Sequence, residues 1–172
     1  MKKKRYKGLI IAVAVIAAIV ALVMWVIYII PGSYSKDNAQ KLLSRNEDEF
    51  VLVTEYLSGY GQSSASISED RETIFIFDGS SGRHEEITDR RVKKAIDRLF
   101  FRGVDGIYWD GENSTHFLVW RRFMDFGAGI VCSDDSSKEP YVHFLTKAEE
   151  LSLDGWYYYE ADYNKWRENG GN

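Results

Sequence analysis

The sequence has few of the residues that cross-link or break a chain. Cys132 is its only cysteine, so no disulfide can form within the chain. Only two prolines occur, Pro31 and Pro140, and we find no internal repeats. A domain without disulfides depends on its hydrophobic core, and ~140 residues can bury about two thirds of their unfolded surface, which is enough. We therefore predict one outer domain, with Cys132 as a small buried hydrophobe.

Motifs for catalysis and metal binding are also missing. The three histidines, His84, His116 and His143, are isolated, and no two of them have the spacing of zinc ligands. The turn at 78–82 lacks the G-x-S-x-G elbow of serine hydrolases. Acidic residues that could serve in glycan hydrolysis stand in or beside predicted turns, where acids often have local backbone roles; they are Asp110, Glu112, Asp125, Asp134 and Asp135. We expect no cofactor, no metal and no enzymatic activity.

One long hydrophobic run stands out, at residues 8–30. Its sequence is GLIIAVAVIAAIVALVMWVIYII, twenty-three residues without a charge. A helix rises ~1.5 Å per residue, so a run of this length spans a hydrocarbon layer of ~30 Å. The run predicts a transmembrane helix.

The flanks of this run predict its orientation. Five basic residues crowd positions 1–7, and Pro31 with Gly32 ends the helix on the other side. Short basic segments stay cytoplasmic, so we expect a single-pass signal-anchor in the cell membrane, with the remaining chain extracytoplasmic. The alternative is a cleaved signal peptide. The anchor is favoured because a signal has only ~7 to 15 apolar residues, but the sequence leaves cleavage open.

The chain then divides into a cytoplasmic basic flank (1–7), a transmembrane helix (8–30), a short tether (31–35) and an outward-facing domain (36–172). Without the five N-terminal basic residues, 17 Lys and Arg remain against 26 Asp and Glu, a net charge of −9. A domain of this charge has no reason to bind nucleic acid.

Helical signals come first in the outer domain. Residues 36–59 predict two short helices or one kinked helix, with Asn46 and Glu49 as a capping box, although the FVLV stretch at 50–53 could instead be a strand. Residues 59–70 have the composition of a loop. The segment 88–103 is the clearest helix, because its apolar residues recur at helical spacing and Gly103 suits its end.

Strand signals dominate the rest of the domain. Residues 73–77 predict a strand covered on both faces, followed by a turn at 78–82. Residues 104–110 and 115–123 predict a hairpin. Up to three more strands are expected, at 127–134, 141–146 and 156–160. This order is typical of an α+β domain in which helices pack on one face of a mostly antiparallel sheet.

The aromatic residues near the chain end form the first candidate binding surface. They are Trp156, Tyr157, Tyr158, Tyr159 and Trp166. Side chains alternate along a strand, so one pair is expected in the core and the other on the outer face, where it could bind a partner or a glycan. The alternative is that all these rings complete a core that has no disulfides.

The predicted helix at 88–103 carries the second candidate surface. Its cations gather opposite Val92, Ile96 and Leu99 on a helical wheel, and they are Arg90, Arg91, Lys94, Arg98 and Arg102. We select Arg91, Lys94 and Arg98 as candidate contacts to an anionic partner. The alternative is a solvated helix face whose charges pair with acids of the same domain.

These patterns predict a membrane-anchored protein that displays a small, non-catalytic protein-binding domain outside the cytoplasm. The expected partner is another membrane or envelope protein. Two alternatives remain open from the sequence: a membrane-anchored hydrolase of envelope polymers, or an accessory subunit of a membrane complex that acts through its transmembrane helix. The latter is suggested by small residues such as Ala14 and Ala18 in the run.

Overall fold

The computed structural model describes residues 34–122, 126–134 and 144–164, together with Pro140, Val142 and four residues of the hydrophobic run. The chain divides into two units, 1–33 and 34–172. Within the first unit, residues 15, 16, 18 and 19 are helical. In the part of the chain that the structure describes, no helix is long and apolar enough to cross a bilayer. The other residues of 8–30 lie outside the described part, so the span stays a prediction.

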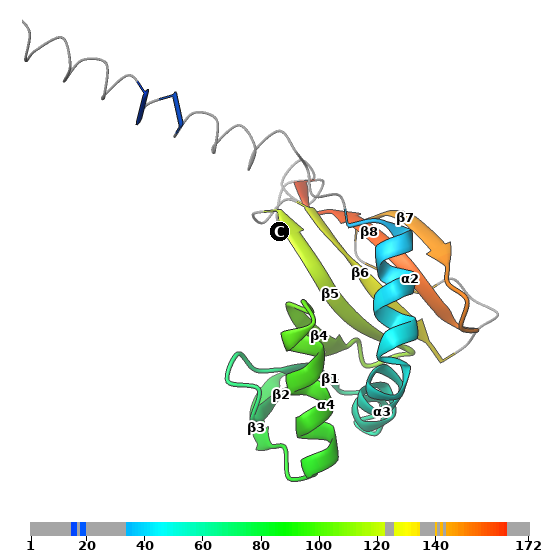
Figure 1. The fold of residues 1–172 in the computed structure, drawn as a ribbon. Helices are drawn as coiled ribbons and strands as arrows, with labels where there is room; N and C mark the ends of the chain where they lie inside the picture. Colours follow the sequence, from blue (N-terminus) through cyan, green and yellow to red (C-terminus); the bar gives the residue numbers. More distant parts are fainter. Residues whose placement is uncertain are drawn as a thin grey trace, which may run out of the picture. The chain divides into compact units, whose positions relative to one another are not determined.

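The second unit is an α+β domain with three helices packed on an antiparallel eight-stranded sheet (Figure 1). The helices are α2 (Lys36–Arg45), α3 (Glu47–Ser58) and α4 (Arg90–Phe101). The strands are β1 (Ser64–Ile67), β2 (Thr73–Asp78), β3 (Ser81–Glu86), β4 (Gly106–Trp109), β5 (Ser114–Arg122), β6 (Phe126–Ser133), β7 (Leu145–Glu150) and β8 (Trp156–Asp162). The strand order is β3-β2-β1-β4-β5-β6-β8-β7. The predicted fold class of this domain is confirmed.

Two separate helices form at 36–58, which is one of the two expected arrangements. Ser35 caps α2 by accepting a hydrogen bond from the Asn38 backbone N–H. Asn46 separates the helices, and its Nδ2 donates to the Leu42 carbonyl at 2.8 Å. The predicted capping box is therefore wrong, because the Asn46 side chain bonds backward to α2 and makes no cap bond to α3. The FVLV stretch is helical and buries Phe50 and Val53.

The observed strands agree with the predicted ones in the centre of the sheet and differ from them toward its edges. The β4–β5 hairpin, β6 and β8 form where they were expected. The region 59–70, expected to be a loop, contains β1, and β3 begins at Ser81, inside the predicted turn at 78–82. The last outer strand, β7, begins at Leu145, so it overlaps only the end of the predicted strand at 141–146.

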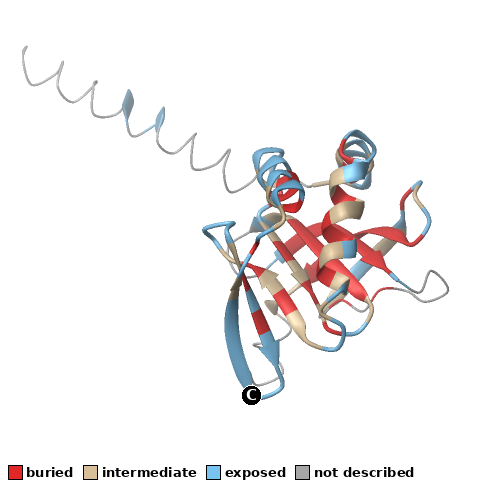
Figure 2. Cartoon of the chain, turned by 90° about the horizontal axis from the view of Figure 1, so that it is seen from below, coloured by how far each residue is buried: buried red, intermediate tan, exposed pale blue. Residues whose placement is uncertain are grey.

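The strand at 73–77 is real, but the expectation that both its faces are covered is wrong. Ile74 and Ile76 are fully buried, whereas Phe75 and Phe77 are 37% and 47% exposed. Figure 2 shows that most of the β2–β3 hairpin is exposed, while buried residues fill the central strands and the inner sides of the helices.

Hydrophobic clusters cover both faces of the central sheet. The larger cluster lies between the helices and the sheet and contains the rings of Phe50, Phe117 and Trp156. The Phe50 ring centroid is 4.6 Å from that of Phe117 and 5.7 Å from that of Trp156. The smaller cluster includes Val131, Tyr157 and Tyr159. The core therefore takes in both sides of β8.

Candidate functional site

The candidate site on the predicted helix at 88–103 is an exposed face of α4 and its surroundings, which we call the cationic surface. It comprises Arg45 of α2, the α4 residues Arg91, Lys94, Arg98 and Phe101, and Arg102, which follows α4. Asp89 caps α4 by accepting a hydrogen bond from the Arg91 backbone N–H at 2.7 Å. Val92, Ala95, Ile96 and Leu99 are buried. Because these four residues turn inward, the cations of the helix face solvent.

Part of this charge is neutralised within the domain. Arg98 Nη1 lies 2.5 Å from Glu49 Oε1 of α3, and Arg91 Nη2 lies 3.5 Å from Asp89 Oδ2. Among the described residues, Lys94, Arg102 and Arg45 form no ion pair. Arg91 and Arg98 thus pair with acids of the same domain, as expected for a solvated helix face. The other cations remain available to an outside partner.

Two shallow hollows lie between α3 and α4. The larger, of about 580 Å³, is lined by Arg45, Asn46, Glu49, Lys94, Asp97, Arg98, Phe101 and Arg102. The smaller, of about 270 Å³, lies beside Asp48, Leu52 and Arg91 and shares Glu49, Lys94 and Arg98 with the first. The larger hollow offers four cationic side chains against two acidic ones, so it favours an anionic ligand group.

Phe101 is the feature of this surface that sequence reasoning missed. It is 84% exposed, more than any other large hydrophobic residue in the described part of the chain. Its spacing from Lys94 and Arg98 places it on their face of the helix. The neighbouring Phe100 is half-buried, and the Arg71 guanidinium lies 4.7 Å from its ring centroid. The Phe100–Phe101 pair was the available signal, because adjacent helical residues cannot both face the core.

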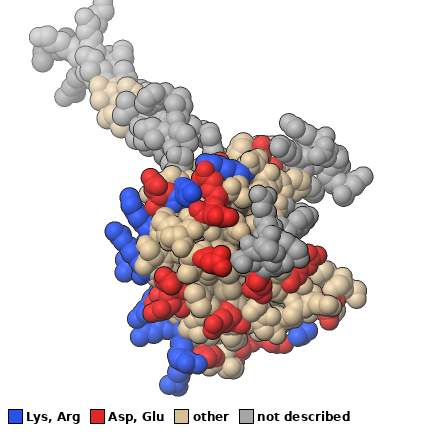
Figure 3. Space-filling view, turned by 90° about the vertical axis from the view of Figure 1, so that its right-hand side faces the viewer, with Lys and Arg blue, Asp and Glu red and all other residues tan. Residues whose placement is uncertain are grey.

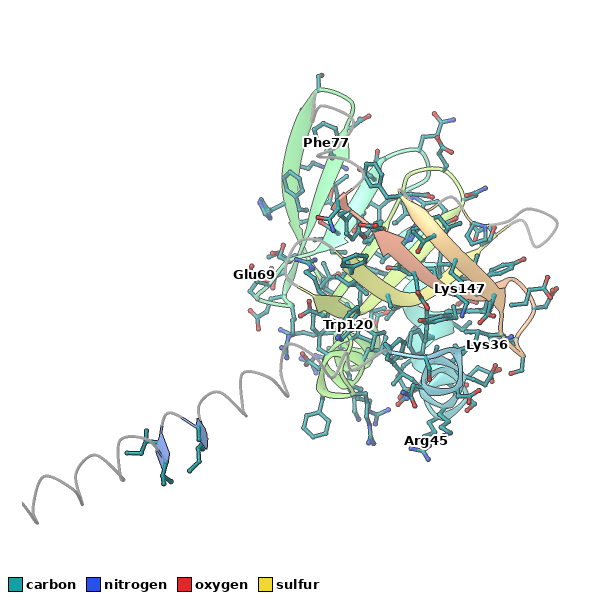
Figure 4. The ribbon with its side chains drawn as sticks, turned by 90° about the horizontal axis from the view of Figure 1, so that it is seen from above. Lys36, Arg45, Glu69, Phe77, Trp120 and Lys147 are labelled. Carbon is teal, nitrogen blue, oxygen red and sulfur yellow. The ribbon has the colours of Figure 1, made fainter. Side chains whose placement is uncertain are left out.

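Charge is unevenly distributed over the domain. In Figure 3, Lys and Arg gather along the left margin of the molecule, whereas Asp and Glu are scattered over the rest of the visible face among other residues. Arg45 lies on the helical layer, and its side chain points away from the sheet (Figure 4). A cationic surface on an otherwise acidic domain is a local feature and is not a result of net charge.

The described residues of the aromatic candidate surface, at the chain end, lie inside the protein. Trp156 and Tyr158 pack in the cluster below the helices, and they are 4% and 1% exposed. Tyr157 and Tyr159 point to the opposite face as expected, but they are only 6% and 0% exposed. Val142, Ala161, Leu145 and Tyr163 belong to the cluster that covers them. The expected exposed pair is therefore not found. Trp166 lies outside the described residues.

The hydroxyl of Tyr158 has a structural role. It donates to the backbone carbonyl of Tyr34 and also lies 2.7 Å from Glu160 Oε1. Burial, followed by the Glu160 carboxylate, raises the pKa of this hydroxyl. A neutral Tyr158 therefore joins the last strand to the start of the domain.

A buried polar group on the second face of the sheet is the closest approach to a catalytic arrangement. His116 Nε2 lies 3.8 Å from Asp110 Oδ2, a separation too long for a hydrogen bond. The other carboxylate oxygen, Oδ1, accepts backbone N–H bonds from Glu112, Asn113 and Ser114. Burial acts to raise the pKa of Asp110, but His116 and the backbone N–H groups of Glu112 and Ser114 outweigh it, so the pKa is lowered. The carboxylate thus holds the β4–β5 turn.

The other reactive groups in the described part of the chain lie apart from one another. Burial raises the pKa of the Cys132 thiol to about 12, which keeps it protonated and unreactive at neutral pH. An open groove of about 940 Å³ near the ends of β4 and β5 is lined by Trp120, Tyr163, Arg121 and Glu69, among others, but by no histidine or cysteine. Among the described residues, no group of three His, Cys, Asp or Glu could hold a metal ion.

Comparisons of the chain with protein-family models, with curated proteins and with solved structures gave no match.

Proposed function

We propose that this chain is a single-pass protein of the cell membrane whose extracytoplasmic domain binds another membrane or envelope protein through the cationic surface. The observation that carries the proposal is Phe101, a large apolar ring that is 84% exposed among arginines and a lysine. Binding is favoured over catalysis because an exposed ring among cations resembles the centre of a protein interface.

Aromatic residues and arginine are enriched where protein interfaces gain most of their binding energy. Phe101 can enter an apolar pocket of a partner, while Lys94, Arg98 and Arg102 meet acidic groups around that pocket. Charge complementarity of this kind also speeds the encounter and selects against basic partners. We therefore expect a partner surface in which an apolar pocket is surrounded by Asp and Glu.

The membrane part of the proposal depends on the sequence. Residues 8–30 would hold the chain in the bilayer with residues 1–7 in the cytoplasm. The tether of five residues, 31–35, is too short to carry the domain far from the lipid. A partner at the membrane surface follows from that short reach. Trp166 remains a candidate contact of this partner.

Photo-cross-linking in native membranes tests the proposal. A photoreactive phenylalanine analogue at position 101 should capture a specific partner. The double variant Arg91→Glu/Lys94→Glu should lower the yield about ten-fold or more, because four charge units of attraction are lost at the interface. Arg98→Ala should lower the cross-linking yield less, because it removes one charge and does not reverse it. This change also breaks the ion pair with Glu49.

A matched control and two contrary outcomes accompany this test. Lys147→Glu, an exposed charge reversal on β7, should leave the cross-link unchanged, and circular dichroism should show that every variant is folded. An unchanged yield in the Arg91→Glu/Lys94→Glu variant would contradict binding at this surface. A complex that survives these changes but is lost when residues 8–30 are exchanged for another span would instead support the accessory-subunit alternative.

A further inference from the structure

The strand β3 lies at one edge of the sheet and is open to solvent. Among the described strands it pairs only with β2, and the sheet order ends there. All of its residues are exposed except Glu85, which is half-buried. Figure 4 labels Phe77 at the far end of this hairpin, which projects away from the helical layer that carries Arg45. No described segment of the chain covers this edge.

The hydrogen-bond pattern shows which peptide groups of β3 point outward. The Ser68 N–H donates to the Thr73 carbonyl, and the Ile87 N–H donates to the Glu72 carbonyl. Bonded pairs alternate in an antiparallel ladder, so Ile74, Ile76 and Asp78 bond to β3. Their partners in β3 are Glu85, Arg83 and Ser81. The peptide groups that point away from the sheet therefore belong to Gly82, His84 and Glu86.

We propose that β3 pairs antiparallel with β3 of a second copy of this chain, about a two-fold axis through His84. In this arrangement His84 lies opposite His84 of the second copy, and Gly82 lies opposite Glu86 of the second copy. These are the residues whose peptide groups point outward, so each can exchange main-chain hydrogen bonds with its counterpart. The two sheets then continue into one another.

The charges of β3 select this register. Arg83 lies opposite Glu85 of the second copy, and the symmetry repeats the pair, so two oppositely charged pairs form. If the axis passes instead through the residue before or after His84, the outward-pointing peptide groups of the two strands still face one another. One of these axes places Arg83 opposite Arg83, and the other places Glu85 opposite Glu85. Like charges directly opposite one another are unfavourable, so the strand is self-complementary in one register.

The exposed rings of β2 give a second reason for a partner at this edge. The Phe75 ring lies over Gly82, where any Cβ atom would overlap it. Phe75 also lies 5.0 Å from the His84 ring, centroid to centroid. The two-fold axis therefore brings Phe75 and His84 of both copies into one row on the same face. Pairing would cover part of the Phe75 surface that is exposed in the single chain.

Sedimentation of the full-length protein in detergent micelles tests the dimer. Arg83→Glu places Glu opposite Glu85 twice and should weaken dimerisation about ten-fold or more. Glu85→Arg should have a similar effect. The combined variant Arg83→Glu/Glu85→Arg restores both opposite pairs and should restore the dimer. Lys147→Glu on β7, the other edge of the sheet, is the matched control and should leave dimerisation unchanged.

Cysteine cross-linking tests the register. Arg83→Cys and Glu85→Cys proteins, mixed in one membrane, should form a disulfide-linked pair, whereas either variant alone should not, because like positions are then too far apart for the bond. His84→Cys alone should link to itself. A monomer at every concentration would overturn the proposal. So would a dimer that Arg83→Glu leaves intact, or a β3 occupied by a strand of another protein.

Discussion

At the scale of single residues, Gly129 shows how closely two central strands approach each other. It lies on β6 opposite Leu118, where the register with β5 shifts before Trp120. A Cβ atom at this position would overlap the Phe117 carbonyl oxygen and would lie 3.0 Å from Cε1 of Tyr159. The glycine is needed because the neighbouring strand and a buried ring occupy the space of a side chain.

Gly129→Ala should therefore destabilise the domain by about 3 kcal/mol, since the backbone must move to accept one methyl group. Urea unfolding followed by tryptophan fluorescence measures the change. Gly106→Ala on β4 is the matched control. There the nearest atom to the added Cβ would be Leu118 Cβ at 3.8 Å, an ordinary contact, so its effect should stay within about 0.5 kcal/mol. Equal effects in the two variants would contradict this account of the close approach.

At the scale of elements, α3 and α4 each present a phenylalanine, but to opposite environments. Phe50 of α3 is fully buried between Phe117 and Trp156. Phe101 of α4 is 84% exposed. The same side chain thus serves the core in one helix and, in our proposal, a partner in the other.

Phe50→Ala should cost about 3 to 5 kcal/mol of unfolding free energy, because it opens a cavity in the core. Phe101→Ala should change the unfolding free energy by no more than about 0.5 kcal/mol, while it lowers partner capture in membranes by a cross-linker placed elsewhere on the cationic surface. Thermal or urea unfolding of the two variants distinguishes these roles. A strongly destabilised Phe101→Ala protein would show that the ring is a structural residue.

The elements that the sequence predicted well are those with strong short-range patterns. The helix at 90–101 has helical periodicity and a capping Asp89, and the β4–β5 hairpin has alternating residues about a turn. In contrast, β1 and β3 are rich in serine, glycine and charged residues. β1 forms between β2 and β4, and its pairing with the distant β4 is a long-range feature that local composition does not reveal. β3 forms by pairing with β2 across the tight turn that joins them, although its own residues have little strand propensity.

The candidate site was predicted only in part for a similar reason. The cations of α4 follow from its helical wheel, but Arg45 joins them through the packing of α2, α3 and α4. The burial of Tyr157 and Tyr159 was not predictable, because Val142 and Leu145, more than ten residues earlier in the chain, help to cover them. Periodicity shows which way a side chain points and does not show what covers it.

At the scale of the whole molecule, the acidic domain has two surfaces that remain open and differ in character. The cationic surface combines Phe101 with charged residues, whereas the edge of β3 offers peptide groups and a self-complementary charge pattern. If the cationic surface binds a partner and the β3 edge binds a second copy, each dimer would present two cationic surfaces, one from each copy. Anchoring in a bilayer would favour both contacts by raising the local concentration.

The most direct test of the account is the topology of the chain in intact cells. A membrane-impermeant maleimide should label Glu112→Cys, an exposed position in the domain, because the proposed topology places the domain outside the cytoplasm. It should label Lys3→Cys only after permeabilisation, and the buried Cys132 should give little background. Labelling of Lys3→Cys in intact cells with protection of Glu112→Cys would contradict the account. So would a mature protein that begins after residue 31 and is free of the membrane.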